Sequence, residues 1–300
     1  MPIFRARDIF FLTCLLWVPV SAFAQDDSDI VTVDSSIVVV NATITDTAGN
    51  HVPGLKQNQF GVFENGVEQE ISFFAAEETP FAAVILLDTS GSMEQRVSLA
   101  RSAAIKFLDG IRDSDNAEIY RFDSKVSLVQ KFSNSRDVSE KLFDLKADGM
   151  TALNDAIFQA AKNLGDRPEK RRAIIVLSDG KDTYSKLSAD KALKAALSVN
   201  ALIYTVDMSA LESSGKERAQ NQGVLRNFAE KTGGIFIATP GGVAMRDAFR
   251  RIVEELGTQY TLAYQPKNLT KDGKWRPIEL RVSKPNLSIR TRKGYHAAKR

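Results

Sequence analysis

An unbroken apolar run at residues 81–87 places the tightest constraint on how this chain folds. Such a run is typical of a central strand that is buried on both faces of a parallel sheet. The run ends in Asp88-Thr-Ser-Gly-Ser92, a tight cluster of hard oxygen ligands. Apolar residues at helical spacing follow, at Val97, Ala100, Ala104, Phe107, Leu108 and Ile111. One carboxylate and two hydroxyls therefore lie on a turn between strand and helix, which we interpret as one third of a divalent-metal site.

The first two dozen residues have the pattern of a secretory signal peptide. Arg5 and Arg7 give a positive start, residues 9–20 are largely apolar, and Ala22-Phe-Ala24 has the small-x-small form of a cleavage site. We therefore expect cleavage after Ala24, and a mature protein that is secreted or periplasmic and has no stable membrane span. The alternative is an uncleaved membrane anchor, for which the apolar stretch is short.

Composition and charge exclude several classes of function. The 300 residues suit one large domain, or one domain with a smaller companion. The net charge of +3 is close to neutral and the basic residues are scattered, so no nucleic-acid surface is indicated. Cys14 is the only cysteine and lies in the signal peptide, while the two histidines, His51 and His296, stand near opposite ends. These counts exclude thiol catalysis, zinc–thiolate sites and a Ser-His-Asp triad within the central part.

Hydropathy patterns divide the rest of the chain into three parts. Residues 25–79 and 258–300 alternate apolar and polar positions, which predicts strands, and Asn65-Gly66 between two such runs predicts a tight hairpin. Residues 80–257 alternate strands with helices, which predicts an α/β fold with a doubly wound, mostly parallel sheet. We expect the two β segments to pair into one small all-β domain, with the α/β domain inserted between them. The alternative is that each β segment packs separately on the α/β domain.

Within the α/β part, strands and helices can be placed from their apolar patterns. Strands are predicted at residues 81–88, 117–122, 126–132, 173–177, 202–206 and 234–237. Helices are predicted at residues 97–111, around 138–146, and at 152–164, 188–199, 224–232 and 243–256. The polar segment 208–223 is predicted to be a long surface loop.

Three polar loops of the α/β part carry further oxygen ligands. Asp88 ends one buried strand, Asp179 follows another, and Thr151 directly precedes a helix. Ligands of open α/β sheets bind beyond the carboxyl ends of the strands, so neighbouring strands would bring both carboxylates to one crevice. Each piece also has an ordinary structural explanation, because Ser90, Ser92 and Thr151 suit helix N-caps and Asp-Gly suits a turn. The combination, in this order, is what makes the pattern specific.

In combination, the three polar loops resemble those of the metal-ion-dependent adhesion site of von Willebrand factor type A domains. The loops are Asp88-Thr-Ser-Gly-Ser92, Gly149-Met-Thr151 and Ser178-Asp179-Gly180. The resemblance covers about residues 81–257 and matches all five of the family's metal-site positions. It implies one antiparallel edge strand, here residues 126–132. The flanking β segments and the signal resemble a type that is common among secreted bacterial proteins. The Thr loop departs from the family pattern, since it reads Asp-Gly-Met-Thr rather than carrying a double glycine.

The resemblance also implies a role for each residue of the site. Ser90, Ser92 and Thr151 would contact the metal through their hydroxyls, while Asp88 and Asp179 would act largely through bound water or serine hydrogen bonds. An all-oxygen site with water ligands suits Mg²⁺, with Mn²⁺ and Ca²⁺ as alternatives. Few direct carboxylate ligands leave the metal able to bind one more, so an Asp or Glu side chain of a partner protein would be the last ligand.

These observations favour a non-enzymatic, metal-dependent protein-binding module for adhesion or interaction. A second interpretation is a metal-assisted hydrolase or phosphatase with Asp88 as nucleophile, but no second carboxylate or basic phosphate clamp is evident beside it. A third is a scaffold protein with a vestigial metal site, whose β-domain is the interaction surface. Asp123, Asp182 and Asp207 also lie near strand ends. Asp182 could line the same crevice, but we expect residues of this kind to cap turns or face water.

Overall fold

The computed structural model describes residues 37–76, 79–209, 215–238 and 242–299. All of these residues belong to one compact unit, Val31–Arg300. The predicted signal peptide and its cleavage site lie outside the described residues. In the part of the chain that is described, no helix is both long and apolar enough to cross a membrane.

A six-stranded sheet lies at the centre of the described residues, with the strand order β10-β9-β8-β5-β6-β7. Its strands are β5 (Phe81–Asp88), β6 (Asn116–Phe122), β7 (Val126–Ser133), β8 (Arg171–Ser178), β9 (Ala201–Asp207) and β10 (Phe236–Ala238). Neighbouring strands are parallel except β6 and β7, so β7 is the predicted antiparallel edge strand. The chain winds outward from β5 in both directions, which places the reversal of strand order between β5 and β8.

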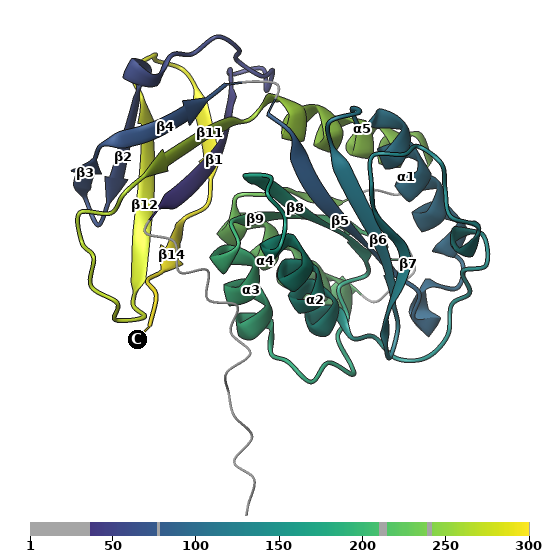
Figure 1. Cartoon of the computed structure of the whole chain (residues 1–300). Coiled ribbons are helices and arrows are strands. Elements are labelled where there is room, and N and C mark those ends of the chain that lie inside the picture. Colours follow the sequence, from purple (N-terminus) through teal and green to yellow (C-terminus); the bar gives the residue numbers. More distant parts are fainter. Residues whose placement is uncertain (1–36, 77–78, 210–214, 239–241, 300) are drawn as a thin grey trace, which may run out of the picture. The chain divides into compact units, whose positions relative to one another are not determined.

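Helices cover both faces of this sheet (Figure 1). One face packs against α1 (Val97–Gly110) and α5 (Gly242–Thr258), and the other against α2 (Leu153–Gly165), α3 (Ala189–Ser198) and α4 (Gly215–Thr232). Successive residues of β5 alternate between the two cores, because side chains of a strand point to opposite faces. Every residue of β5 is buried, which explains its unbroken apolar run.

Strands from both ends of the described chain pair with one another in two antiparallel sheets, ordered β13-β1-β11-β4 and β14-β12-β2-β3. Their bounds are β1 (Val38–Thr45), β2 (Phe60–Glu64), β3 (Val67–Gln69), β4 (Ile71–Ala75), β11 (Tyr260–Tyr264), β12 (Trp275–Val282), β13 (Ser288–Thr291) and β14 (Gly294–His296). Asn65 and Gly66 join β2 to β3 with φ of 51° and 78°, the left-handed conformation that such a hairpin requires. The predicted fold class, a mostly parallel α/β sheet inserted between paired β segments, is therefore confirmed.

Arg171, the first residue of β8, contacts both segments that connect the α/β sheet to the antiparallel sheets. Its buried guanidinium donates to Thr261 Oγ1 at 3.0 Å. It also donates to a set of backbone carbonyl oxygens from the two connections, those of Ala76, Thr79, Leu256, Gly257 and Gln259. One side chain therefore holds the two connections together at the beginning of β8.

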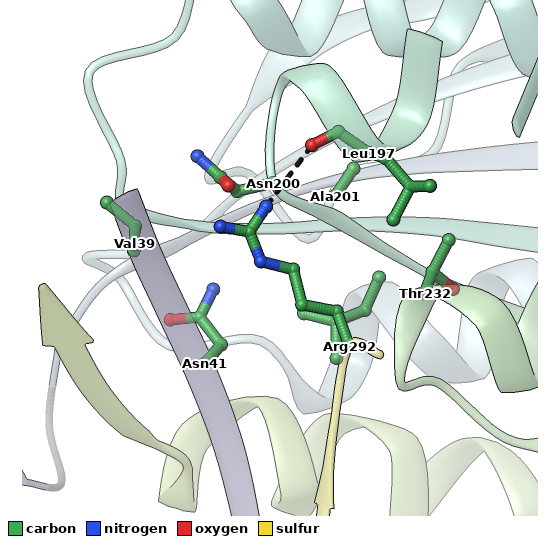
Figure 2. Close-up of a pocket in the computed structure, with 8 residues that line it drawn as sticks. Val39, Asn41, Leu197, Asn200, Ala201, Thr232 and Arg292 are labelled. Carbon is green, nitrogen blue, oxygen red and sulfur yellow. Dashed lines mark hydrogen bonds between the residues drawn. The ribbon is translucent and has the colours of Figure 1, made fainter. Parts of the chain in front are cut away.

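A cavity of about 10 Å³ lies beside Arg292 (Figure 2). The Arg292 guanidinium is buried and donates to the Leu197 carbonyl oxygen at 3.3 Å, in the last turn of α3. Burial lowers the pKa of Arg292 to about 10. Its Nε has no hydrogen-bond partner among the described residues. The volume suits one water molecule, so this cavity is too small to be the binding site of a larger ligand.

Residues 138–146 do not form the predicted helix. Only Glu140–Leu142 makes a short 3₁₀ turn, and the residues that follow are irregular. Leu142 and Leu145 are nevertheless buried in the same core as α1, so the apolar spacing is satisfied without a helix. The Gln130 side chain provides hydrogen bonds in place of helical ones, because it accepts from the backbone of Ser139 at 3.0 Å.

Helix α4 begins earlier than predicted. Residues 208–223 were expected to form a loop, whereas α4 begins at Gly215. The first half of α4 is polar and is held by polar contacts: Gln222 donates to Asp207 at 2.7 Å, and Glu217 pairs with Lys181 at 2.8 Å. The periodicity of apolar residues cannot reveal a helix that is fixed in this way.

Candidate metal-binding site

The five residues predicted to bind metal lie on three loops at the carboxyl ends of central strands. Asp88 is the last residue of β5, and Ser90 and Ser92 follow in the turn that leads to α1. Thr151 precedes α2, and Asp179 directly follows β8. Because β5 and β8 are parallel neighbours, Asp88 and Asp179 emerge at the same edge of the sheet, where the strand order reverses.

Backbone hydrogen bonds join the three loops. Gly91 N donates to Gly149 O at 3.1 Å, which connects the first loop to the second. Thr151 O accepts from Tyr184 N at 2.9 Å, which connects the second loop to the third. The loops that the sequence pattern singled out separately therefore form one continuous structure.

Serine groups hold both oxygens of the Asp88 carboxylate. Oδ1 accepts from Ser90 N at 2.9 Å and from Ser90 Oγ at 2.6 Å. Oδ2 accepts from Ser178 Oγ at 2.5 Å. Ser90 Oγ also lies 3.2 Å from Ser92 Oγ, within hydrogen-bond distance. Asp88, Ser90 and Ser92 thus share one network, which also includes Ser178, a residue of the sequence motif to which the pattern assigned no role.

Asp88 is a buried carboxylate whose hydrogen bonds within the described residues come from neutral groups only. Its exposed fraction is 0%. Burial raises its pKa to about 6, against the effect of the serine hydrogen bonds, and the negative charge of Asp179 adds to the increase. No cationic side chain of the described residues therefore pairs with the ionised carboxylate. A divalent cation beside the serine hydroxyls would supply a compensating positive charge.

Asp207 and Ser209 repeat the local geometry of the Asp88 turn at the end of β9. Ser209 N and Ser209 Oγ donate to Asp207 Oδ1 at 2.9 and 2.5 Å. The other oxygen, Asp207 Oδ2, accepts from Gln222 at 2.7 Å and lies 3.6 Å from the guanidinium of Arg218. An Asp-x-Ser turn after a strand is therefore not a metal site by itself. Among the described residues, a cationic side chain lies near Asp207, whereas the hydrogen-bond donors to Asp88 are serine groups.

Thr151, Asp179 and Ser92 supply the remaining oxygens. Thr151 is 3% exposed, and its Oγ1 makes no hydrogen bond to another described residue, so this hydroxyl is available to a ligand. Asp179 is also buried, and its Oδ1 accepts from Lys181 N at 3.0 Å. Ser92 is exposed, which leaves the network of hydroxyls open to solvent on its side.

Asp123 and Asp182, which also lie near strand ends, serve the local backbone. Asp182 Oδ2 accepts from Asn154 N at 3.0 Å in the first turn of α2, and its Oδ1 accepts from Ser185 N at 3.0 Å. Asp123 Oδ1 accepts from Lys125 N at 2.9 Å. These carboxylates therefore cap a helix and a turn.

Gly149 shapes the loop that carries Thr151. Its φ of 75° lies in the left-handed region, and a Cβ at this position would lie 2.8 Å from Ser124 Oγ. Met150 is not among the described residues with positive φ, so a side chain is compatible with its backbone. The single glycine of this loop therefore stands where glycine is needed.

The donor set of the site fits a hard divalent cation. No group of three or more His, Cys, Asp and Glu side chains able to hold a metal occurs among the residues with described structure. The candidate site is instead made of hydroxyl and carboxylate oxygens, which are ligands that Mg²⁺ accepts together with water. The five residues of the site therefore fit the divalent cation that the three loops predict.

Residues 83–181 match the sequence profile of the von Willebrand factor type A domain, and they include all five residues of the site. This match assigns residues 83–181, and not the whole chain, to the von Willebrand factor type A domain. A solved von Willebrand factor type A structure from Catenulispora acidiphila has a TM-score of 0.51 at 14% identity, over 87% of this chain and 73% of that one. The pilus adhesin SpaC of Lactobacillus rhamnosus GG, in an open conformation, has a TM-score of 0.50 at 10% identity, over 84% and 49% of the two chains. At these identities the similarity concerns the fold alone.

The chain is also similar in sequence to parts of several known proteins. An uncharacterised protein of Synechocystis is 30% identical over 123 residues, which are 38% of this chain and 28% of that protein. The chain spans between 14% and 63% of the length of the curated relatives that it matches. None of the proteins named here is described as an enzyme.

Proposed function

We propose that this protein is a secreted, metal-dependent protein-binding module of the adhesion type. In this proposal a divalent cation at Asp88, Ser90, Ser92, Thr151 and Asp179 is completed by an Asp or Glu side chain of a partner protein. The observation that carries the proposal is the buried Asp88 carboxylate, which is surrounded by hydroxyls and has no cationic partner among the described residues. A divalent cation would compensate the charge of this carboxylate.

Mg²⁺ is the proposed metal, with Mn²⁺ and Ca²⁺ as alternatives. The hydroxyls of Ser90, Ser92 and Thr151 would bind it directly. Asp88 already accepts hydrogen bonds on both oxygens, so it would act through Ser90 and through water. When bound, the metal supplies a Lewis-acidic position for a carboxylate oxygen.

The hydrolase interpretation is disfavoured by the position of Asp88. A carboxylate nucleophile must reach the substrate, whereas Asp88 is fully buried and both of its oxygens are covered by Ser90 and Ser178. The interpretation as a vestigial site is also disfavoured, because it leaves a buried negative charge uncompensated.

Two further observations support adhesion outside the cytoplasm. The fold is similar to that of SpaC, which is a pilus adhesin. The first two dozen residues have the pattern of a cleavable secretory signal. We therefore propose that the mature protein lies in the periplasm or outside the cell.

Thermal unfolding in Mg²⁺ and in EDTA tests the metal site. Mg²⁺ should raise the melting temperature of the wild type, by the equivalent of about 2.7 kcal/mol at 100 times its Kd, and Asp88→Ala should abolish this response. Asp207→Asn is the matched control, because it changes the same kind of turn outside the site, and it should keep the response to Mg²⁺. A folded wild type that does not respond to Mg²⁺, Mn²⁺ or Ca²⁺ would refute the proposal.

A pull-down from an envelope extract tests the partner. The wild type should retain a protein in Mg²⁺ and release it in EDTA, and Asp88→Ala should not retain it. A protein retained equally in Mg²⁺ and EDTA would contradict metal-dependent binding and would point to another surface, such as the antiparallel sheets.

A further inference from the structure

Two large side chains beside Thr151 are exposed to solvent. Met150, which directly precedes Thr151, is 53% exposed, and Tyr184 is 52% exposed. Tyr184 is adjacent to Thr151 in space, because its backbone N donates to Thr151 O at 2.9 Å. The two exposed residues therefore flank the residue whose hydroxyl is available for the proposed metal.

The backbone beneath these two side chains is held in place. Met150 N donates to Ser124 Oγ at 3.1 Å, in addition to the hydrogen bond made by Tyr184 N. Three large apolar side chains on the segments around the site are almost fully buried, namely Met93, Leu153 and Met208. Met150 and Tyr184 are more than half exposed, so they differ from these core residues.

The two residue types suit a surface that another protein covers. Tyrosine and methionine are enriched at protein interfaces, and tyrosine is common among the residues that dominate binding energy. A partner that covers both side chains would also exclude water from the neighbouring metal and carboxylate. Their attraction is stronger in such an environment than in bulk water.

We propose that Met150 and Tyr184 form an apolar rim that selects the partner of the metal site. The partner is a protein loop or extended segment in which the metal-binding Asp or Glu has a bulky apolar side chain within about two residues, the span that an extended segment places across such a site. This inference rests on the proposed function, since it concerns the partner of the same site. It adds to that function a preference for particular acidic segments among the possible partners of the metal site.

Selection from a displayed library of random peptides tests the rim. Peptides are bound to the immobilised wild type in Mg²⁺ and eluted with EDTA, and the selection is repeated with the double variant Met150→Ser, Tyr184→Ser. Leu269→Ser is the matched control, because Leu269 is also exposed, at 65%, but lies in the loop between β11 and β12. Thermal unfolding in Mg²⁺ verifies that each variant is folded and keeps its metal response.

The wild type and Leu269→Ser should enrich peptides that carry Asp or Glu next to a bulky apolar residue. Peptides enriched on the double variant should still carry the acidic residue, but they should no longer favour a neighbouring bulky apolar residue. A synthetic copy of the most enriched peptide should bind the double variant at least about tenfold more weakly than the wild type.

Enrichment of acidic peptides without an apolar preference would overturn the rim and leave the proposed function intact. Equal affinity of the synthetic peptide for the wild type and the double variant would also overturn it. Eluted peptides without an acidic residue would instead contradict the proposed function, so the two failures are distinguishable.

Discussion

Ser178 and Asp88 end two neighbouring parallel strands, and the Ser178 hydroxyl donates a 2.5 Å hydrogen bond to the buried Asp88 carboxylate. The register explains the contact, because Leu87 pairs with Leu177 and the next residue of each strand reaches the same edge of the sheet. The Ser178 hydroxyl also accepts from Gly180 N at 3.0 Å. Ser178 therefore connects the first loop of the site to the third.

Replacing Ser178 with alanine should destabilise the metal-free protein and weaken Mg²⁺ binding. Asp88 Oδ2 and Gly180 N both lose a partner, and a buried group left without one costs about 1–3 kcal/mol. Urea unfolding in EDTA measures this cost. The control is Ser102→Ala, which removes an exposed hydroxyl of α1 and should change the free energy of unfolding by less than about 0.5 kcal/mol. Equal effects of the two substitutions would contradict this role of Ser178.

Replacing Asp88 with asparagine should stabilise the protein in EDTA while removing its response to Mg²⁺. Burial raises the pKa of Asp88 to about 6, so above that pH the native state has to hold a negative charge that it disfavours. A neutral amide removes this charge but also replaces one acceptor oxygen, such as the one that faces Ser178, so we expect a net gain of about 1 kcal/mol at neutral pH. Urea unfolding at pH 7.5, with and without Mg²⁺, provides the measurement. A lower free energy of unfolding in EDTA would show that the Asp88 carboxylate does not destabilise the metal-free protein.

Replacing Gly149 with alanine should distort the loop that carries Thr151. The left-handed φ of 75° costs about 1–2 kcal/mol for a residue with a Cβ, and the new atom would also meet Ser124 Oγ at 2.8 Å. The double variant Gly149→Ala, Ser124→Ala removes the collision, but it keeps the backbone cost and loses the hydrogen bond from Met150 N, so it should recover only part of the stability. Mg²⁺ titration by calorimetry should show weaker binding in both variants. Unchanged Mg²⁺ affinity in Gly149→Ala would show that the conformation of this loop does not affect metal binding.

The local features of the site could be predicted because they depend on short stretches of sequence. The apolar run that becomes β5 and the Asp-x-Ser-x-Ser turn after it are contiguous, and the hairpin at Asn65 follows from two residues that accept positive φ. The helix expected around residues 138–146 was wrong because Leu142 and Leu145 are buried equally well by an irregular segment. Spacing alone does not separate these two outcomes.

Tertiary contacts were the part that the sequence pattern could not provide. The link from Ser178 to Asp88 depends on the register of two strands that are 90 residues apart. The difference between the Asp88 and Asp207 turns depends on a helix, α4, whose Gln222 donates to Asp207 and whose Arg218 brings a positive charge to it. Local sequence makes the two turns look alike, and only their surroundings distinguish a candidate metal site from a structural turn.

Replacing Arg171 with methionine should separate the unfolding of the antiparallel sheets from that of the α/β sheet. The change removes the buried donors that hold both connecting segments, including the contact with Thr261, and leaves several carbonyl oxygens unpaired, so we expect a loss of at least about 3 kcal/mol. Trp275 fluorescence reports on β12, whereas far-UV circular dichroism is dominated by the helices around the central sheet. In urea, the two signals should give coincident transitions for the wild type and separate ones for Arg171→Met.

The control for this substitution is Arg281→Met, because Arg281 is exposed and pairs with Glu279 at the surface. It should lower the free energy of unfolding by less than about 1 kcal/mol and keep the transitions coincident. Coincident transitions at an unchanged midpoint in Arg171→Met would contradict the assignment of Arg171 as the contact that holds the two connections. Such a result would leave the shared hydrogen bonds of β1 and the residues around Glu255 as the alternative link.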